Sequence, residues 1–387
     1  MVYLHTEPLI LHVSIGYGHT KTATILSNEL KKQTNFQPQI LDLFSLLPRW
    51  QSEFIRTSYY KLIKNAPSIW GTLYHNTAKS ETTYVTHDLL ATVFYSKLAL
   101  ILADPEIPFI ISTHTYVTRI IAIWKQKLGI HTPLYHICTD FGFHQLAIHS
   151  EVTGYFLSGL ATLPPSLEQD KSVYSYGIPV EKDQDQVISK SVRRSMFGFT
   201  EDEQIVMIAG GGEGIAPYES ILESLQVLSN LTILCMTGTN EQVHPYNHAS
   251  KQGHSIHFIS FTEHFSNYVH LSDVLITKAG GQTLAHALTT DTPVVLYQPI
   301  QGQEVENAQL LKDKKAAIYA RNSHQLLDAV YTFLNNPAAR LVYLQQAQSI
   351  SKPNATQKII HQITHQHQAY DLEEPFFHVG VKSIAEY

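Results

Sequence analysis

Short apolar runs alternate along the first half of the chain with segments whose apolar residues recur at helical spacing. Residues 9–14 form the first such run, which ends in a Gly-Tyr-Gly turn at 16–18 and precedes a segment with Ala23, Leu26 and Leu30 on one face. Further runs lie at 39–42, 108–113, 133–140 and 155–158. Strands that alternate with helices predict an α/β fold with a parallel, doubly wound sheet.

The same pattern restarts near residue 204. Apolar runs lie at 205–209, 231–236, 255–259, 274–277 and 294–297, with helical segments between most of them. A Gly/Pro turn at 176–180 and the polar stretch 181–190 separate the halves. We therefore predict Rossmann-like domains at 1–178 and 191–352, a linker at 179–190, and a C-terminal helix and tail at 353–387 that pack back on the first domain. The two domains are expected to face each other across a cleft at the carboxyl ends of their strands.

Composition narrows the class of protein. A net charge of −6 over 387 residues argues against bulk nucleic-acid binding. Cys138 and Cys235 lie in apolar runs and are interpreted as reduced core residues. The N-terminus lacks the features of a signal peptide, and no apolar run approaches the ~20 residues of a membrane span. His361 and His365 lie at i, i+4 spacing, but without a third ligand they do not predict a metal site. We expect a cytoplasmic protein.

Two glycine-rich turns in the second half each follow an apolar run and precede a helical segment. They read GGGEG at 210–214 and TKAGGQT at 277–283. Glycines allow close approach of a ligand to the backbone, and a helix N-terminus presents free N–H groups to an anion. The turns predict a nucleotide or diphosphate ligand that needs no metal. Neither matches the P-loop or GxGxxG pattern, which argues against ATP hydrolysis and dinucleotide redox chemistry.

Five blocks carry a resemblance to a known family. The segments ITKAGGQTL at 276–284 and QPIQGQEVENA at 298–308 resemble the ITKPGG-T and NP-PGQE-EN blocks of processive diacylglycerol glucosyltransferases and plant monogalactosyldiacylglycerol synthases. SIGYGH at 14–19 resembles the family's S-G-GH loop, and Thr139-Asp140 with His144 resembles its TD block. GGGEGIAP at 210–217 is similar to the GGGEGMGP of the galactolipid synthases.

The resemblance implies a GT-B architecture and an inverting, metal-free transfer of a hexose from a UDP-sugar to diacylglycerol. It favours glucose over galactose, although the residues themselves do not decide between the two. It places Gly280, Gly281 and Thr283 at the diphosphate and Gln303 and Glu304 at the sugar hydroxyls. The other residues that it implies for the donor site are Gly211, Gly212, Glu213, Lys278, Gln282 and Asn307.

One position departs from the family pattern. His286 stands where the family usually has a glutamate that holds the ribose hydroxyls. A neutral imidazole accepts one hydrogen bond where a carboxylate accepts several, so we expect the ribose to be held more weakly or by other groups.

The acceptor end needs a base near the attacking hydroxyl. His19 ends the glycine loop after the first run, and Asp140 ends the run at 133–140, so both belong to the same edge of the predicted sheet. We predict His19 as the base and Asp140 as its partner, with the reverse assignment open.

The stretch 49–79 mixes basic and aromatic residues, which suits a peripheral contact with the anionic inner face of the cell membrane. The residues predicted for the acceptor or membrane are Gly18, Trp50, Arg56, Tyr60, Lys61, Lys64 and Trp70, and Lys79 adds to the charge.

Three alternatives for the function of the protein stay open: transfer to another lipid-linked or soluble acceptor, a UDP-sugar 2-epimerase, and a non-catalytic UDP-sugar binder.

Overall fold

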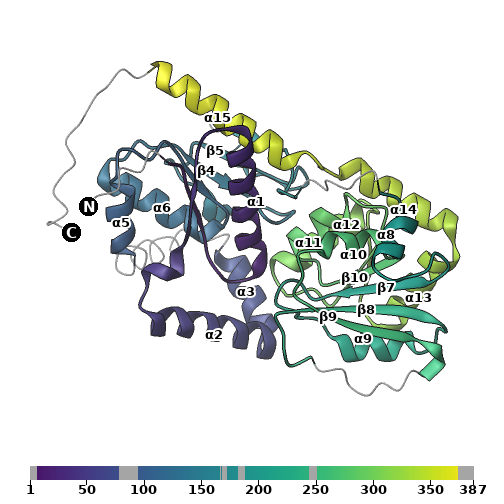
Figure 1. The fold of residues 1–387 in the computed structure, drawn as a ribbon. Coiled ribbons are helices and arrows are strands. Elements are labelled where there is room, and N and C mark those ends of the chain that lie inside the picture. The colour runs from purple at the N-terminus through teal and green to yellow at the C-terminus, as the bar shows by residue number, and fades with distance from the viewer. Residues whose placement is uncertain are drawn as a thin grey trace. The chain divides into compact units, whose positions relative to one another are not determined.

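The structure, a computed structural model, describes residues 7–77, 95–165, 167, 172–181, 188–243 and 251–373. The chain divides into two compact units (Figure 1). One comprises Met1–Ile15, His19–Pro179 and Asn354–Tyr387, and the other comprises Gly16–Gly18 and Val180–Pro353. We call them the N-terminal and C-terminal units.

The N-terminal unit is built on a six-stranded, all-parallel sheet with the order β2-β1-β3-β4-β5-β6. The strands are β1 (Leu9–His12), β2 (Gln39–Asp42), β3 (Ile110–Ser112), β4 (Leu134–Ile137), β5 (Gly154–Phe156) and β6 (Ser172–Tyr174). The helices are α1 (Tyr17–Gln33), α2 (Arg49–Asn65), α3 (Pro67–Thr77), α5 (Ser96–Leu102), α6 (Thr115–Leu128) and α15 (Ala355–Glu373), with short 3-10 turns η1 (Leu43–Leu46) and η2 (Gln145–Ala147).

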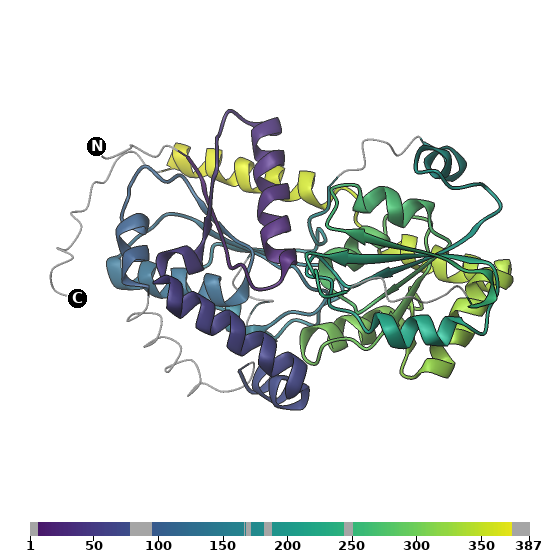
Figure 2. The ribbon, with the colours of Figure 1, turned by 60° about the horizontal axis from the view of Figure 1, so that its bottom comes forward.

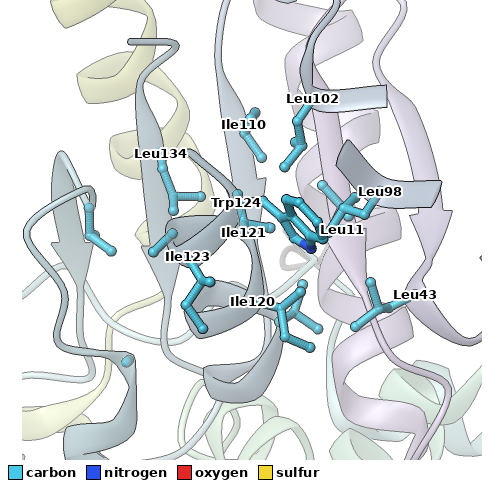
Figure 3. Packing of buried hydrophobic residues seen from close by; sticks show 14 of the residues in the cluster. Leu11, Leu43, Leu98, Leu102, Ile110, Ile120, Ile121, Ile123, Trp124 and Leu134 are labelled. Carbon is cyan, nitrogen blue, oxygen red and sulfur yellow. The ribbon is translucent and has the colours of Figure 1, made fainter. Parts of the chain in front are cut away.

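Alternate residues of β1 serve two separate cores, as the period of a buried strand requires. Leu9 and Leu11 pack with α5 and α6 on one face of the sheet. Figure 3 shows Trp124 of α6 in this cluster, beside side chains of the strands such as Leu11 and Ile110. Ile10 packs on the other face with α1 and with Ile359, Ile360 and Ile363 of α15.

Helix α6 shows how local sequence sets an element. The side chain of His114 caps its first turn by accepting a hydrogen bond from the backbone N–H of Tyr116 at 3.1 Å. Val117, Ile120, Ile121 and Trp124, at i, i+3, i+4 and i+7, are buried. Gly129 ends the helix in the left-handed conformation at φ 66°, which a side chain would disfavour.

The C-terminal unit repeats the plan with the strand order β12-β11-β10-β7-β8-β9, again all parallel. Its strands are β7 (Gln204–Ala209), β8 (Leu231–Gly238), β9 (Ser255–Ser260), β10 (Val274–Thr277), β11 (Val294–Tyr297) and β12 (Ile318–Ala320). Its helices are α8 (Lys190–Met196), α9 (Tyr218–Leu225), α10 (Phe265–Leu271), α11 (Gly281–Ala287), α12 (Gln303–Asp313), α13 (Ser323–Asn335) and α14 (Pro337–Ile350), with the 3-10 turn η3 (Lys251–Gly253). Figure 2 shows this sheet nearly edge-on, with helices on both sides.

The predicted α/β class and parallel sheets are confirmed. The sequence did not reveal β6 and β12, which are three residues long and lie at the sheet edges. Helix α15 belongs to the N-terminal unit, where Gln366 Nε2 donates to Tyr174 Oη at 2.8 Å.

A buried ionic cluster ties α8 to the start of two strands of the C-terminal unit. Asp273 accepts hydrogen bonds from Lys190 Nζ at 2.6 Å, from Arg194 Nη2 at 2.7 Å and from the Ile205 backbone N–H at 2.8 Å. The side chains of Arg194 and Asp273 are 5% and 15% exposed. Removing one member of such a pair leaves the other charge buried and uncompensated.

We therefore expect Asp273→Asn to lower the free energy of unfolding by about 3–5 kcal/mol, the usual effect of breaking a buried ion pair. Urea unfolding followed by circular dichroism measures this. Glu53→Ala is the control because it breaks the ion pair of Glu53 with Arg49, in which both side chains are exposed, 60% and 91%. Equal unfolding midpoints for the two variants would contradict a stabilising role for the Asp273 cluster.

Candidate active site

Both sheets have a point at which the strand order reverses. In the N-terminal unit β1 lies between β2 and β3, so the chain adds β2 on one side of β1 and then β3 on the other. In the C-terminal unit β7 lies between β8 and β10, so the chain adds β8 and β9 on one side of β7 and then β10 on the other. The loops after the strands at such a point diverge and leave space for a ligand at the carboxyl edge. His19 follows β1, and the two glycine-rich turns follow β7 and β10.

Backbone register brings the loops at each point together. Leu11 of β1 pairs with Ser112 of β3, and Ser112 pairs with His136 of β4. In the C-terminal unit Thr277, the last residue of β10, pairs with Ala209, the last residue of β7. Strands β1, β3 and β4 therefore end within one residue of the same level, β7 and β10 end at the same level, and the loops that follow start side by side in each sheet.

The ring of His19 is fixed in one tautomer. Its Nδ1 lies 2.8 Å from the backbone carbonyl oxygen of Thr113 and 3.1 Å from Thr139 Oγ1. A carbonyl oxygen can only accept, so Nδ1 carries the proton and Nε2 holds the free lone pair. Thr113 also donates its hydroxyl to the His19 carbonyl oxygen at 3.2 Å. His19 can therefore act as a proton acceptor through Nε2.

Other histidines surround this ring. The ring centroids of His19 and His114 lie 4.4 Å apart, edge to face. His136 Nδ1 lies 2.7 Å from Thr118 Oγ1, and His12 Nδ1 lies 3.2 Å from Thr20 Oγ1. Across the described ranges no group of three or more His, Cys, Asp or Glu side chains could hold a metal ion.

Burial sets the charge of these histidines. Loss of hydration lowers the pKa of His19 to about 4, although the hydrogen bond to Thr113 acts in the opposite direction. Burial also lowers the pKa of His136 to about 3, lowers that of His12, and holds that of His114 well below its usual value. The cluster is neutral at physiological pH, so Nε2 of His19 is unprotonated.

Thr113, His114 and Thr139 were not among the predicted site residues. Thr113 and His114 directly follow β3, and the strand-end argument used for His19 would have found them had the neighbour of β1 been known. Asp140 lies in the loop after β4, where its carbonyl oxygen accepts the Cys138 thiol at 3.3 Å. The hydrogen bonds described for the His19 ring come from Thr113 and Thr139, so the pairing of Asp140 with His19 stays a prediction.

The first glycine-rich turn of the C-terminal unit is folded against the end of β8. Gly214, at φ 62°, lies so close to β8 that an added Cβ would stand 1.7 Å from the carbonyl oxygen of Thr237. Backbone N–H groups of Gly214 and Ile215 donate to the carbonyl oxygens of Gly211 and Gly210. The turn thus requires glycine at 214 and carries the predicted donor-site residues Gly211, Gly212 and Glu213.

The second turn is held from α12. Lys278 Nζ lies 2.7 Å from Glu304 Oε1, and Asn307 Nδ2 donates to the carbonyl oxygen of Ala279 at 3.1 Å. Ala279 has φ 77°, unusual for a residue with a side chain. A Cβ on Gly211 would lie 3.6 Å from Lys278 Cε, so the lysine lies beside both glycine-rich turns. Gly280, Gly281, Gln282 and Thr283 follow at the start of α11.

Glu304 and Gln303 differ in their surroundings. Glu304 is buried, pairs with Lys278 through Oε1 and accepts the Ile300 backbone N–H through Oε2 at 2.9 Å. In the described part of the chain, Gln303 Oε1 is buried without a hydrogen-bond partner. His286 lies on α11 with its ring centroid 6.2 Å from that of Phe265. Glu304 therefore positions Lys278, whereas Gln303 has an acceptor oxygen left for a ligand.

The basic, aromatic segment forms α2 and α3 in the N-terminal unit (Figures 1 and 2). Trp50 and Phe54 are 69% and 68% exposed, and Lys61 and Lys64 are exposed on the same helix. The remaining predicted residues are more enclosed: Tyr60 is half-buried, Trp70 packs edge to face on Tyr59, Gly18 is half-buried and Arg56 pairs with Asp42. Lys79 lies outside the described residues. Among those residues, no helix is long and apolar enough to cross a membrane.

Each half of the chain matches a family of known proteins. Residues 19–180 match the sequence model of the family described as monogalactosyldiacylglycerol (MGDG) synthase, and residues 205–363 match that of the glycosyltransferase family 28 C-terminal domain. The processive diacylglycerol beta-glucosyltransferase of Bacillus mycoides (strain KBAB4) is 23% identical over 384 residues, covering 97% of this chain and 96% of that protein. The protein of the same name from Bacillus pumilus (strain SAFR-032) is 24% identical over 366 residues, covering 92% and 94%.

Solved structures show the fold. MurG of Acinetobacter baumannii aligns with a TM-score of 0.58 at 16% identity, covering 93% of this chain and 99% of that one. The calicheamicin glycosyltransferase CalG4 aligns with a TM-score of 0.61 at 10% identity, covering 95% and 99%. These are GT-B glycosyltransferases, and the predicted GT-B fold is confirmed.

The buried neutral state of His19 has a measurable consequence. Its pKa in the folded protein, about 4, lies below the ~6.5 of an unfolded chain. Between these values the unfolded state binds the proton more readily, so His19 contributes stability above pH ~6.5 that is lost as the pH falls toward 4. An NMR titration of the His19 ring, assigned with His19→Ala, should give a pKa well below 6.5. A value at or above 6.5 would contradict this account of the site.

Proposed function

Because the chain joins a monogalactosyldiacylglycerol synthase domain to a glycosyltransferase family 28 C-terminal domain, we propose that it transfers a hexose from a UDP-sugar to the hydroxyl of diacylglycerol with inversion at the anomeric carbon. The observation that carries the proposal is His19, a neutral imidazole with its Nε2 lone pair free, at the reversal point of the first of these domains. Its relatives named beta-glucosyltransferases favour glucose as the sugar.

His19 supplies the base in this proposal. As the acceptor oxygen attacks the anomeric carbon, its hydroxyl proton becomes acidic and passes to His19 Nε2. The resulting imidazolium keeps its Nδ1–H hydrogen bond to the Thr113 carbonyl oxygen, which stabilises the positive charge. A neutral imidazole in this tautomer needs no reorientation to accept the proton.

The two glycine-rich turns supply the leaving-group side. Backbone N–H groups near Gly280 and Gly281 and the ammonium of Lys278 provide positive potential for the departing UDP without a metal ion. Glu304 keeps Lys278 directed toward the turns, and Gln303 Oε1 accepts a hydroxyl of the sugar. His286 holds the ribose through one hydrogen bond instead of the several that a carboxylate would accept.

A direct test measures UDP release from UDP-glucose and UDP-galactose with and without diacylglycerol in mixed micelles. We expect release that depends on diacylglycerol and is fastest with UDP-glucose. His19→Ala should lower turnover by about 10²-fold or more, the usual scale for a general base, while UDP binding is retained.

The other possible results of this assay are informative. Release that a soluble acceptor stimulates and diacylglycerol does not would reassign the acceptor, and release at equal rates with and without any acceptor would indicate hydrolysis of the UDP-sugar in place of transfer. UDP binding without turnover would indicate a non-catalytic UDP-sugar binder. Normal turnover in His19→Ala would move the base to Asp140 or to another group.

We also propose that α2 brings the protein to the cytoplasmic face of the cell membrane. Trp50, Phe54, Lys61 and Lys64 lie at i, i+4, i+11 and i+14 and are all exposed, so one outward face combines apolar and cationic side chains. Aromatic residues suit the interfacial region of a bilayer, and each cation near an anionic surface contributes ~1 kcal/mol.

Replacing Lys61 and Lys64 by glutamine should reduce binding to vesicles with anionic lipid by about 30-fold, since two such cations are lost. Vesicle sedimentation measures the change. Lys31→Gln/Lys32→Gln is the matched control, because these lysines are exposed on α1 of the same unit and the change in net charge is equal. Equal losses in the two double variants would mean that charge alone, and not the face of α2, drives binding.

A further inference from the structure

We propose that Arg56 is a positioning residue of the acceptor site, which fixes the loop in front of His19 to helix α2, and not a lipid contact. The expected effect of Arg56 on turnover rests on the proposed function, whereas hydrogen exchange tests the contact between Arg56 and the loop independently of that function. Among the cations of α2, Arg56 contacts Ser14, Asp42 and Phe44, whereas Lys61 and Lys64 are exposed.

Helix α2 has two unlike faces. The exposed residues Trp50, Phe54, Lys61 and Lys64 form the outward face. Ile55 lies on the other side and packs against the apolar core of the N-terminal unit. No residue of α2 is fully buried, so the helix depends on few contacts for its position. Arg56 follows Ile55 on this inward side.

The guanidinium of Arg56 is held by three groups that are distant in sequence. Its Nη2 donates to Ser14 Oγ and lies 3.4 Å from Asp42 Oδ2. Its Cζ lies 5.6 Å from the ring centroid of Phe44, as in a cation–π contact. The side chain keeps 41% of its surface exposed, so the role of Arg56 lies in these directed contacts and not in burial.

Asp42 connects these contacts to the loop. Its Oδ1 accepts the Ser14 and Phe44 backbone N–H groups, each at 3.1 Å, and its Oδ2 accepts the Ser14 hydroxyl. The Ser14 hydroxyl therefore donates its single proton to Asp42 and accepts a hydrogen bond from Arg56 with one of its lone pairs. Ser14 is fixed through both its backbone and its side chain.

Ser14 begins the loop that leads to His19. The loop turns at Gly16, whose φ of 72° favours glycine, and His19 lies in the first turn of α1. His19 is fixed at the far end by Thr113 and Thr139. The loop is thus held at both ends, and Arg56 links its first residue directly to α2. A displacement of about 1 Å at a reacting group can cost 10²-fold in rate, so this link bears on turnover.

The effect on catalysis is tested with Arg56→Gln, which removes the charge and the directed Nη2 donor. We expect kcat to fall by about tenfold or more on acceptor in detergent and on acceptor in vesicles alike, because the loop is displaced in both. Vesicle binding should change no more than in Lys31→Gln, the matched single-charge control. Loss of vesicle binding with normal turnover in detergent would make Arg56 a lipid contact and overturn the proposal.

Coupling to Ser14 separates positioning from general destabilisation. Ser14→Ala should also lower kcat, and adding Arg56→Gln should lower it little further, because both act through one contact. Arg56→Lys should recover part of the activity. Additive losses, accompanied by a lower melting temperature in each variant, would reduce Arg56 to a structural role.

Hydrogen exchange decides the structural part whether or not the wild-type protein transfers sugar. Arg56→Gln should speed amide exchange in residues 14–19 while α6 exchanges as in the wild type. Unchanged exchange at 14–19 would overturn the proposal. If the wild type releases no UDP, the proposed function fails, and this measurement still shows whether Arg56 holds the loop.

Discussion

The parallel direction of the strands is the constraint on which the candidate site residues of each unit depend. All strands of a parallel sheet end at one edge, and the reversal of strand order opens that edge between two neighbouring loops. In the N-terminal unit the reversal lies between β1 and β3, and it brings the loop of His19 beside Thr113. In the C-terminal unit it lies between β7 and β10, and it brings the GGGEG turn beside Lys278.

Within these loops the side chains are held mostly by backbone groups and neutral partners. The carbonyl oxygen of Thr113 fixes the tautomer of His19, and Asn307 fixes the backbone of the second glycine-rich turn. Two of the predicted donor-site residues, Lys278 and Glu304, form a close ion pair. For the proposed diphosphate leaving group, a lysine fixed in this way and aligned backbone dipoles require little rearrangement when the ligand binds.

The sequence was sufficient for the features that depend on local pattern. Apolar runs and glycine turns located most strands, and the family blocks indicated residues in the loops after β1, β7 and β10 whose roles stay predictions. The sequence was insufficient where the pairing of strands decides which side chains lie close together. Thr113 meets His19 only because β3 pairs with β1, which no local pattern indicates. Likewise, composition grouped Arg56 with the lysines of α2, and only the folded position of Asp42 shows which way its guanidinium points.

The central claim is an inverting transfer onto diacylglycerol, and the chemistry of the lipid product tests it most directly. The donor sugar is α-linked to UDP, so a single displacement with His19 as base yields a β-glycoside. Proton NMR of the lipid made from UDP-glucose and diacylglycerol reports the anomeric configuration. We expect a β-linked hexose on the glycerol hydroxyl; an α-linked product, or a sugar on any other acceptor, would rule out inverting transfer onto diacylglycerol.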